Sequence, residues 1–144
     1  MSFRTEARVG VKADSQRIWD IVADLPFWSS WNPVWTEAEG TIAFGGALRW
    51  TETIEGLPHR RAQVAIADWV PGSRLKWAEK RGWLFDVTGF IDIEELQPGS
   101  CIVTVGEIYD GWRGEGHQEE HRGKLKSAYH AIAEALRDRA EAAA

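Results

Sequence analysis

The sequence is poor in several residue types, and each shortage excludes a class of protein. Cys101 is the single cysteine in 144 residues, so no internal disulfide and no cysteine-based metal cluster can form. Lys and Arg number 17 against 22 Asp and Glu, and a net charge of −5 argues against a general nucleic-acid binder. No apolar run approaches the roughly 20 residues of a membrane span, and residues 1–6 lack the apolar core of a signal peptide. We therefore expect one cytoplasmic domain over residues 1–144, with no membrane insertion.

Several catalytic motifs are also missing. The chain has no phosphate-cradling glycine-rich loop, no dinucleotide fingerprint and no Gly-x-Ser-x-Gly elbow. Cys101 falls in a strand pattern near valines, which is typical of an inert buried thiol. We therefore expect no cofactor and no nucleotide-dependent chemistry.

Tryptophan is the residue type in excess, with nine copies spread along most of the chain. Each ring buries a large area and carries an N–H group that needs a partner when it is dry. So many rings indicate either an unusually aromatic core or an aromatic-walled cavity, and composition cannot choose between the two.

The hydrophobic pattern predicts mixed α and β structure. Residues 3–11 alternate as a half-buried strand, and Asp14 is typical of the N-cap of a short amphipathic helix that stops before Pro26. From 35 to 109, regularly spaced glycine turns predict an antiparallel meander of six strands. The last segment, 115–144, carries a helical apolar stripe. The stripe consists of Leu125, Ala128, Tyr129, Ile132 and Leu136.

Four local motifs in this order carry a resemblance to a known superfamily. Residues 13–24 are similar to its first helix, which follows a small residue and ends at an Asp, and 27–33 contain its Trp-Asn-Pro turn. Residues 71–77 match its turn into a strand, and 98–100 stand where its members turn before the last strand. The whole chain thus resembles the START/Bet v 1-like (SRPBCC) superfamily, and most of all its polyketide cyclase/dehydrase-like bacterial branch.

The resemblance implies an α+β helix-grip fold. A curved seven-stranded antiparallel sheet would wrap a long C-terminal helix, with two short helices after the first strand. The cavity between sheet and helix would bind a hydrophobic small molecule, because members include lipid and hormone carriers and aromatase/cyclases. Fold alone does not assign function, so the cavity lining must be argued from residues.

His117 and His121 are four residues apart on the final helix, a geometry that metal sites use. The string also fits the H-x-x-E-H pattern of inverted zinc proteases. A third protein ligand would have to come from elsewhere, however, and nearby glycines weaken the helix, so we predict no metal site. Both histidines continue the stripe backwards from Leu125 and could contact a ligand or move a proton at the pocket mouth. The alternative is a surface or gap-filling position.

Three strand carboxylates, Glu52, Glu79 and Glu107, are in phase with apolar neighbours. If they face the cavity, at least one should have a raised pKa and could act as a general acid or base. Strand ends usually leave the core, so exposure to water is the expectation for these side chains. Glu107 and Tyr109 form the pair of most interest, because the last strand lies next to the helix in this fold.

Four aromatic residues, Trp50, Trp77, Phe85 and Tyr109, are in phase with inward positions and could wall the cavity. The complete set of candidate ligand-binding residues is Trp50, Glu52, Trp77, Glu79, Phe85, Glu107, Tyr109, His117 and His121.

The leading hypothesis is a protein that sequesters a hydrophobic or aromatic small molecule, as a monomer or homodimer, with no strong catalytic constellation. A second hypothesis is a cofactor-independent cyclase or dehydratase in which Glu107, Tyr109 or His121 moves protons. A third is a protein-docking module of the chaperone-activator kind, which would need an exposed aromatic patch. That patch would consist of Trp28, Trp31, Trp35 and Trp112.

Overall fold

The computed structural model describes residues 3–81, 85–111 and 113–142. Its elements follow the order that the sequence predicts, one strand, two short helices, six strands and a long final helix. They are β1 (Phe3–Val11), α1 (Ser15–Ala23), η1 (Leu25–Ser30), β2 (Trp35–Gly40), β3 (Ala47–Glu52), β4 (Arg60–Val70), β5 (Arg74–Arg81), β6 (Phe85–Gln97), β7 (Ser100–Asp110) and α2 (Gly114–Glu141).

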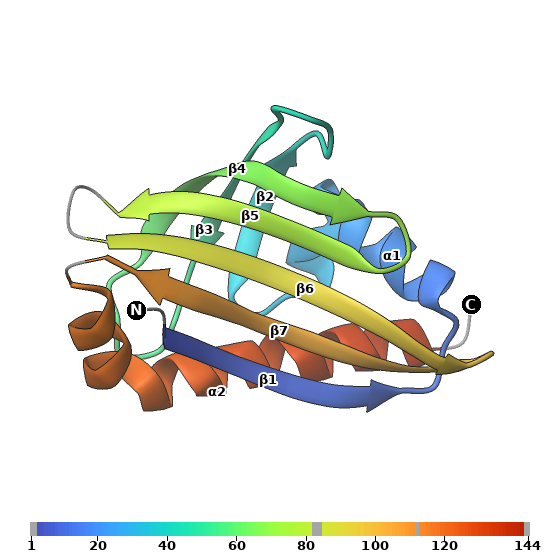
Figure 1. Ribbon diagram of the computed structural model, residues 1–144. Helices are drawn as coiled ribbons and strands as arrows, with labels where there is room; N and C mark the ends of the chain where they lie inside the picture. Colours follow the sequence, from blue (N-terminus) through green and yellow to red (C-terminus); the bar gives the residue numbers. More distant parts are fainter. Residues whose placement is uncertain (1–2, 82–84, 112, 143–144) are drawn as a thin grey trace.

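All seven strands form one antiparallel sheet in the order β1-β7-β6-β5-β4-β3-β2. The chain meanders from β2 to β7, and β1 closes the order by pairing with β7, so that Phe3 lies opposite Tyr109. The sheet curves around α2, and the short helices α1 and η1 lie at one end (Figure 1). The helix-grip fold is therefore confirmed. Within the described residues, no helix is both long and apolar enough to cross a membrane.

The local signals in the sequence explain the elements. In β1 the buried positions Thr5, Ala7, Val9 and Val11 alternate with exposed or half-buried ones, as the period of a strand requires. Asp14 occupies the N-cap position of α1, although its side chain makes no capping hydrogen bond. Proline near the start of η1 lacks a backbone N–H and suits the first turn of a helix.

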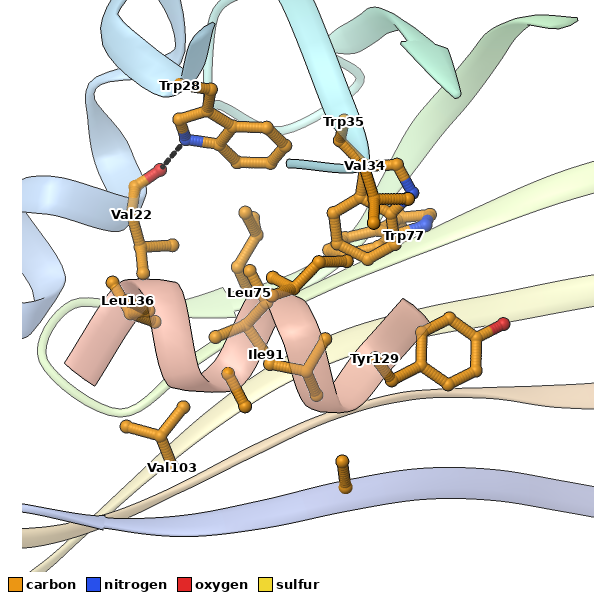
Figure 2. Packing of buried hydrophobic residues seen from close by; sticks show 14 of the residues in the cluster. Val22, Trp28, Val34, Trp35, Leu75, Trp77, Ile91, Val103, Tyr129 and Leu136 are labelled. Atoms are coloured by element: carbon orange, nitrogen blue, oxygen red, sulfur yellow. Dashed lines mark hydrogen bonds between the residues drawn. The ribbon is translucent and has the colours of Figure 1, made fainter. Parts of the chain in front are cut away.

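The core lies between the concave face of the sheet and the apolar stripe of α2. The predicted stripe is confirmed, since all five of its residues are buried against the sheet. Figure 2 shows Leu136 and Tyr129 at opposite ends of the drawn part of α2, and both belong to the same buried cluster as Ile91 and Val103. The hydroxyl of Tyr129 points away from the aliphatic part of this core.

Candidate functional site

Four tryptophans fill much of the space that the sheet encloses. Trp28, Trp35, Trp50 and Trp77, which we call the tryptophan cluster, are each at most 2% exposed. Their ring centroids lie 5.1 to 6.1 Å apart in five contacts, distances typical of favourable aromatic pairs. Figure 2 shows Trp35 and Trp77 together above α2, and the Trp28 indole donating to the Val22 carbonyl oxygen. The rings therefore form core, including Trp50 and Trp77, which the sequence suggested as cavity lining.

The cluster also removes two of the four rings from the aromatic docking patch on which the third hypothesis depended. Trp28 and Trp35 are completely buried, and Trp31 is half-buried. Trp112 lies outside the described residues. Two of the four rings are thus inaccessible to a partner, because Trp28 of η1 and Trp35 of β2 pack against each other and against Trp50.

A small pocket of about 170 Å³ remains at the other end of the grip, beside the N-terminal half of α2. Polar and charged side chains from β3, β4, β5, β7 and α2 line it, together with two residues of the β3–β4 loop. The lining residues are Glu52, Leu57, Pro58, Arg60, Arg81, Glu107, His117, His121 and Leu125. Of the nine predicted ligand-binding residues, Glu52, Glu107, His117 and His121 come together here.

The expected exposure of the three carboxylates is wrong. Glu52, Glu79 and Glu107 are only 8%, 7% and 4% exposed. The curved strands keep these positions inside the grip, and each carboxylate has hydrogen-bond donors within reach. Buried carboxylates need such partners, since an isolated charge in a dry interior is very costly.

Arg60, at the first position of β4, joins two of these carboxylates. Its Nε donates to Glu52 Oε2 at 2.8 Å, while Nη1 and Nη2 donate to the two oxygens of Glu79 at 2.7 and 2.9 Å. The indole N–H of Trp35 donates to the other oxygen of Glu52 at 3.1 Å. Burial opposes the charge on Arg60, but the bonds to Glu79 and Glu52 raise its pKa above the ordinary value. Sequence reasoning missed Arg60, because nothing in its neighbourhood distinguishes it from the adjacent Arg61.

Glu107 has a different environment, made of two tyrosine hydroxyls. Tyr109 Oη lies 2.9 Å from Glu107 Oε1, and Tyr129 from α2 also donates to Oε1. The two hydroxyl oxygens lie 2.6 Å apart. Glu107 and Tyr109 share one face of β7 because they are two residues apart. The sequence predicted Tyr129 only as a core residue. Its position on the apolar stripe, which faces the last strand, was the signal that could have indicated its contact with Glu107.

Burial raises the pKa of Glu107 to about 7, and the negative charge of Glu52 adds to the effect. The hydrogen bonds from Tyr129 and Tyr109 and the charge of Arg60 act in the opposite direction. Burial first, and then the charge of Glu107, raises the pKa of both tyrosines, which therefore stay protonated. Glu107 is thus a buried acid that changes its charge near neutral pH.

The two histidines lie half-buried at the edge of this pocket. The His117 ring stacks on Phe85 at 4.8 Å and lies 5.0 Å from the His121 ring. Burial lowers the pKa of His117 to about 4, with the charge of Arg81 as the next cause, so His117 is neutral at pH 7. His121 Nδ1 is buried and has no hydrogen-bond partner among the described residues.

Phe85 and Arg81 complete this side of the site. The Arg81 guanidinium lies over the Phe85 ring, 5.4 Å from its centroid, and Nη1 is 3.8 Å from Glu79 Oε1. In the part of the chain that the structure describes, no group of three or more His, Cys, Asp or Glu residues could hold a metal ion.

The geometry defines a helix-grip domain whose interior is mostly aromatic, with one small pocket lined by ionisable groups. The family model for polyketide cyclase/dehydrase and lipid transport proteins matches residues 2–141. The chain belongs to this family. A search of curated proteins finds no match.

Solved structures of the same fold are similar over almost the whole chain at low sequence identity. The Zhui aromatase/cyclase from a Streptomyces species matches with a TM-score of 0.78 and 14% identity, over 98% of this chain and 94% of that one. Truncated norcoclaurine synthase from Thalictrum flavum has a TM-score of 0.71 and 13% identity, over 100% and 96% of the two chains. A START superfamily protein from Mycobacterium smegmatis has a TM-score of 0.62 and 20% identity, over 92% and 98%. At these identities the likeness shows the fold alone.

Proposed function

We propose that the pocket binds a small organic molecule with a single ring, oriented by a hydrogen bond to Glu107. The size of the pocket supports one ring, since a protein cavity of about 150 Å³ holds benzene and this pocket measures about 170 Å³. Membership of a family that includes cyclases and lipid transport proteins supports a small-molecule ligand.

The observation that carries this proposal is the difference in hydrogen bonding between the two carboxyl oxygens of Glu107. Both tyrosine hydroxyls bind Oε1, so Oε2 takes no part in this pair of hydrogen bonds. Glu107 lines the pocket, and we propose that a ligand binds its Oε2. His121 Nδ1 lacks a partner in the same lining and offers a second polar contact.

Glu107 would present a different hydrogen bond below and above its pKa of about 7. Protonated Glu107 donates to a ligand carbonyl, whereas ionised Glu107 only accepts. Acetophenone, which has an acceptor and no donor, should therefore bind more tightly at pH 6 than at pH 8. Phenol, which can donate, should show the opposite trend. Binding is measured by ligand-observed NMR and by titration calorimetry.

Two variants test the assignment. Glu107→Gln keeps a neutral donor, so acetophenone binding should persist and lose its pH dependence, while Glu107→Leu should remove binding. Glu94→Gln, at an exposed position on β6, is the matched control and should behave as the wild type. Binding of acetophenone by the wild type that does not change between pH 6 and pH 8 would contradict the role of Glu107.

A second function is favoured by the same raised pKa. A carboxyl group that titrates near pH 7 in a pocket is suited to general acid–base catalysis. Ionised Glu107 would take a proton from the carbon beside a ligand carbonyl and return it to a leaving hydroxyl, which departs as water. Such a dehydration consumes no cofactor. The description of the family, which names a cyclase and a dehydrase, lends support.

Proton transfer can be tested without the natural substrate. In D₂O, the wild type should speed up deuterium exchange at the methyl group of acetophenone, followed by proton NMR. Glu107→Gln should abolish the acceleration and Glu94→Gln should retain it. If acetophenone binds but exchange proceeds at the buffer rate, the catalytic function is rejected and ligand binding alone remains.

A further inference from the structure

No member of the tryptophan cluster is among the described residues that line the pocket. Trp35 nevertheless contacts the lining residue Glu52 and also Tyr129, which binds Glu107. The indole N–H of Trp35 donates to Glu52 Oε1, and Glu52 lines the pocket. The Trp35 ring also lies 6.5 Å from the ring of Tyr129, whose hydroxyl binds Glu107. Trp35 therefore contacts both acidic residues of the pocket, Glu52 directly and Glu107 through Tyr129.

Three features hold Trp35 in this position. The side chain of Asn32, only 2% exposed, accepts hydrogen bonds from the backbone N–H groups of Val34 and Trp35 at 2.9 and 2.8 Å. The Trp77 ring stands edge-on to Trp35, with centroids 5.3 Å apart and planes at 84°. Trp77 itself needs the glycine at position 89, because a Cβ there would lie 2.1 Å from its Nε1.

A fixed aromatic ring behind a lining residue prevents the pocket from extending past that residue and so limits the length of its ligands. The pocket measures about 170 Å³, enough for one six-membered ring by comparison with the roughly 150 Å³ that holds benzene. Trp35 is fully buried and packed on Trp28, Trp50 and Trp77, so the space it occupies is closed to a ligand.

We propose that Trp35 is the specificity-determining residue of the pocket and restricts its ligands to those with a single ring. Replacing the indole with a smaller side chain would extend the pocket behind Glu52 and admit a second fused ring. This inference rests on the proposed function, since it concerns what the same pocket accepts.

Two ketones that differ by one fused ring form the test. Acetophenone and 2-acetonaphthone carry the same acetyl group, so Glu107 can make the same hydrogen bond to either. Wild type should bind acetophenone and bind 2-acetonaphthone at least tenfold more weakly. Trp35→Leu should bind 2-acetonaphthone at least tenfold more tightly than wild type does, measured by calorimetry at pH 6.

Two further variants keep the test decisive. Trp35→Phe retains a ring while losing the N–H group that binds Glu52, and a smaller gain for 2-acetonaphthone is expected even if Trp35→Leu does not fold. Trp69→Leu removes a half-buried tryptophan on β4 that contacts Phe44, and the ligand preference of this variant should match that of the wild type.

The outcomes separate the two proposals. If wild type binds acetophenone and the folded Trp35 variants gain nothing for 2-acetonaphthone, the role of Trp35 is refuted while the binding function stands. Equal binding of both ketones by wild type also refutes it. If neither wild type nor any variant binds acetophenone, the proposed function fails and the inference fails with it.

Discussion

Glu107→Gln should make the protein more stable at pH 8, although it alters a buried polar network. The pKa of Glu107 lies at about 7 in the folded chain, against an ordinary value of 4.5. Folding must therefore work against ionisation of this carboxyl group. One pKa unit corresponds to about 1.4 kcal/mol, so ionised Glu107 lowers the free energy of unfolding by about 3 kcal/mol.

The sign follows from proton binding in the two states. Between pH 4.5 and about 7 the folded chain holds the Glu107 proton that the unfolded chain releases. The contribution of Glu107 to stability is therefore fully present below pH 4.5, falls as the pH rises, and is lost above about 7. Glutamine has no such penalty, and its amide oxygen still accepts the bonds from Tyr109 and Tyr129.

Urea unfolding followed by tryptophan fluorescence, at pH values from 4.5 to 8.5, measures this difference. The free energy of unfolding of the variant, relative to that of the wild type, should increase steadily with pH. The difference should reach about 3 kcal/mol at pH 8, or roughly 6–12 °C in Tm for a chain of this length. Groups common to both proteins cancel in the comparison. A difference in the free energy of unfolding that stays constant across the pH range would show that Glu107 does not titrate as described. A wild type that becomes more stable relative to the variant as the pH rises would refute the sign.

Three other substitutions test the packing and charge pairing by the same unfolding assay. Arg60→Met leaves Glu52 and Glu79 buried without their cation and should cost about 3–5 kcal/mol at pH 7. The cost should shrink at pH 4. A loss of stability that does not change with pH would contradict the pairing of Arg60 with the two carboxylates. Gly89→Ala drives a methyl group into Trp77 and should cost at least about 1–3 kcal/mol, whereas Gly116→Ala, with open space on α2, should stabilise by roughly 0.5–1 kcal/mol. Leu136→Ala, at a fully buried position, should cost about 2–5 kcal/mol, and a cost under 1 kcal/mol would place Leu136 outside the core.

The fold could be predicted because its signals are local and repeated. Alternation along residues 3–11 reports one buried face of β1, and the stripe from Leu125 to Leu136 reports the buried face of α2. Glycine turns at regular spacing divide the strands between them. Each of these signals depends on residues that are close in the sequence, so it can be recognised without knowledge of tertiary contacts.

The site depends on contacts between distant residues, and the sequence gives less notice of these. Periodicity placed Glu52 and Glu107 in phase with buried neighbours, but it cannot show which long cationic side chain reaches them. Arg60 reaches Glu52 across neighbouring strands, and it reaches Glu79 from β4 to β5. Without that knowledge, exposure was the reasonable expectation for a carboxylate near a strand end. The burial of Glu52 and Glu79 therefore follows from the position of one arginine.

The tryptophans show why composition could not separate core from cavity wall. Trp35 belongs to the core by its burial and its ring contacts, yet its N–H group holds the Glu52 carboxylate that lines the pocket. The negative charge of Glu52 in turn helps to keep Glu107 protonated at neutral pH. A ring that fills the interior thus also fixes the charge facing a ligand. The aromatic packing and the acid chemistry of this chain therefore depend on the same residue. A change in Trp35 should alter both the size of the pocket and the pKa of Glu107.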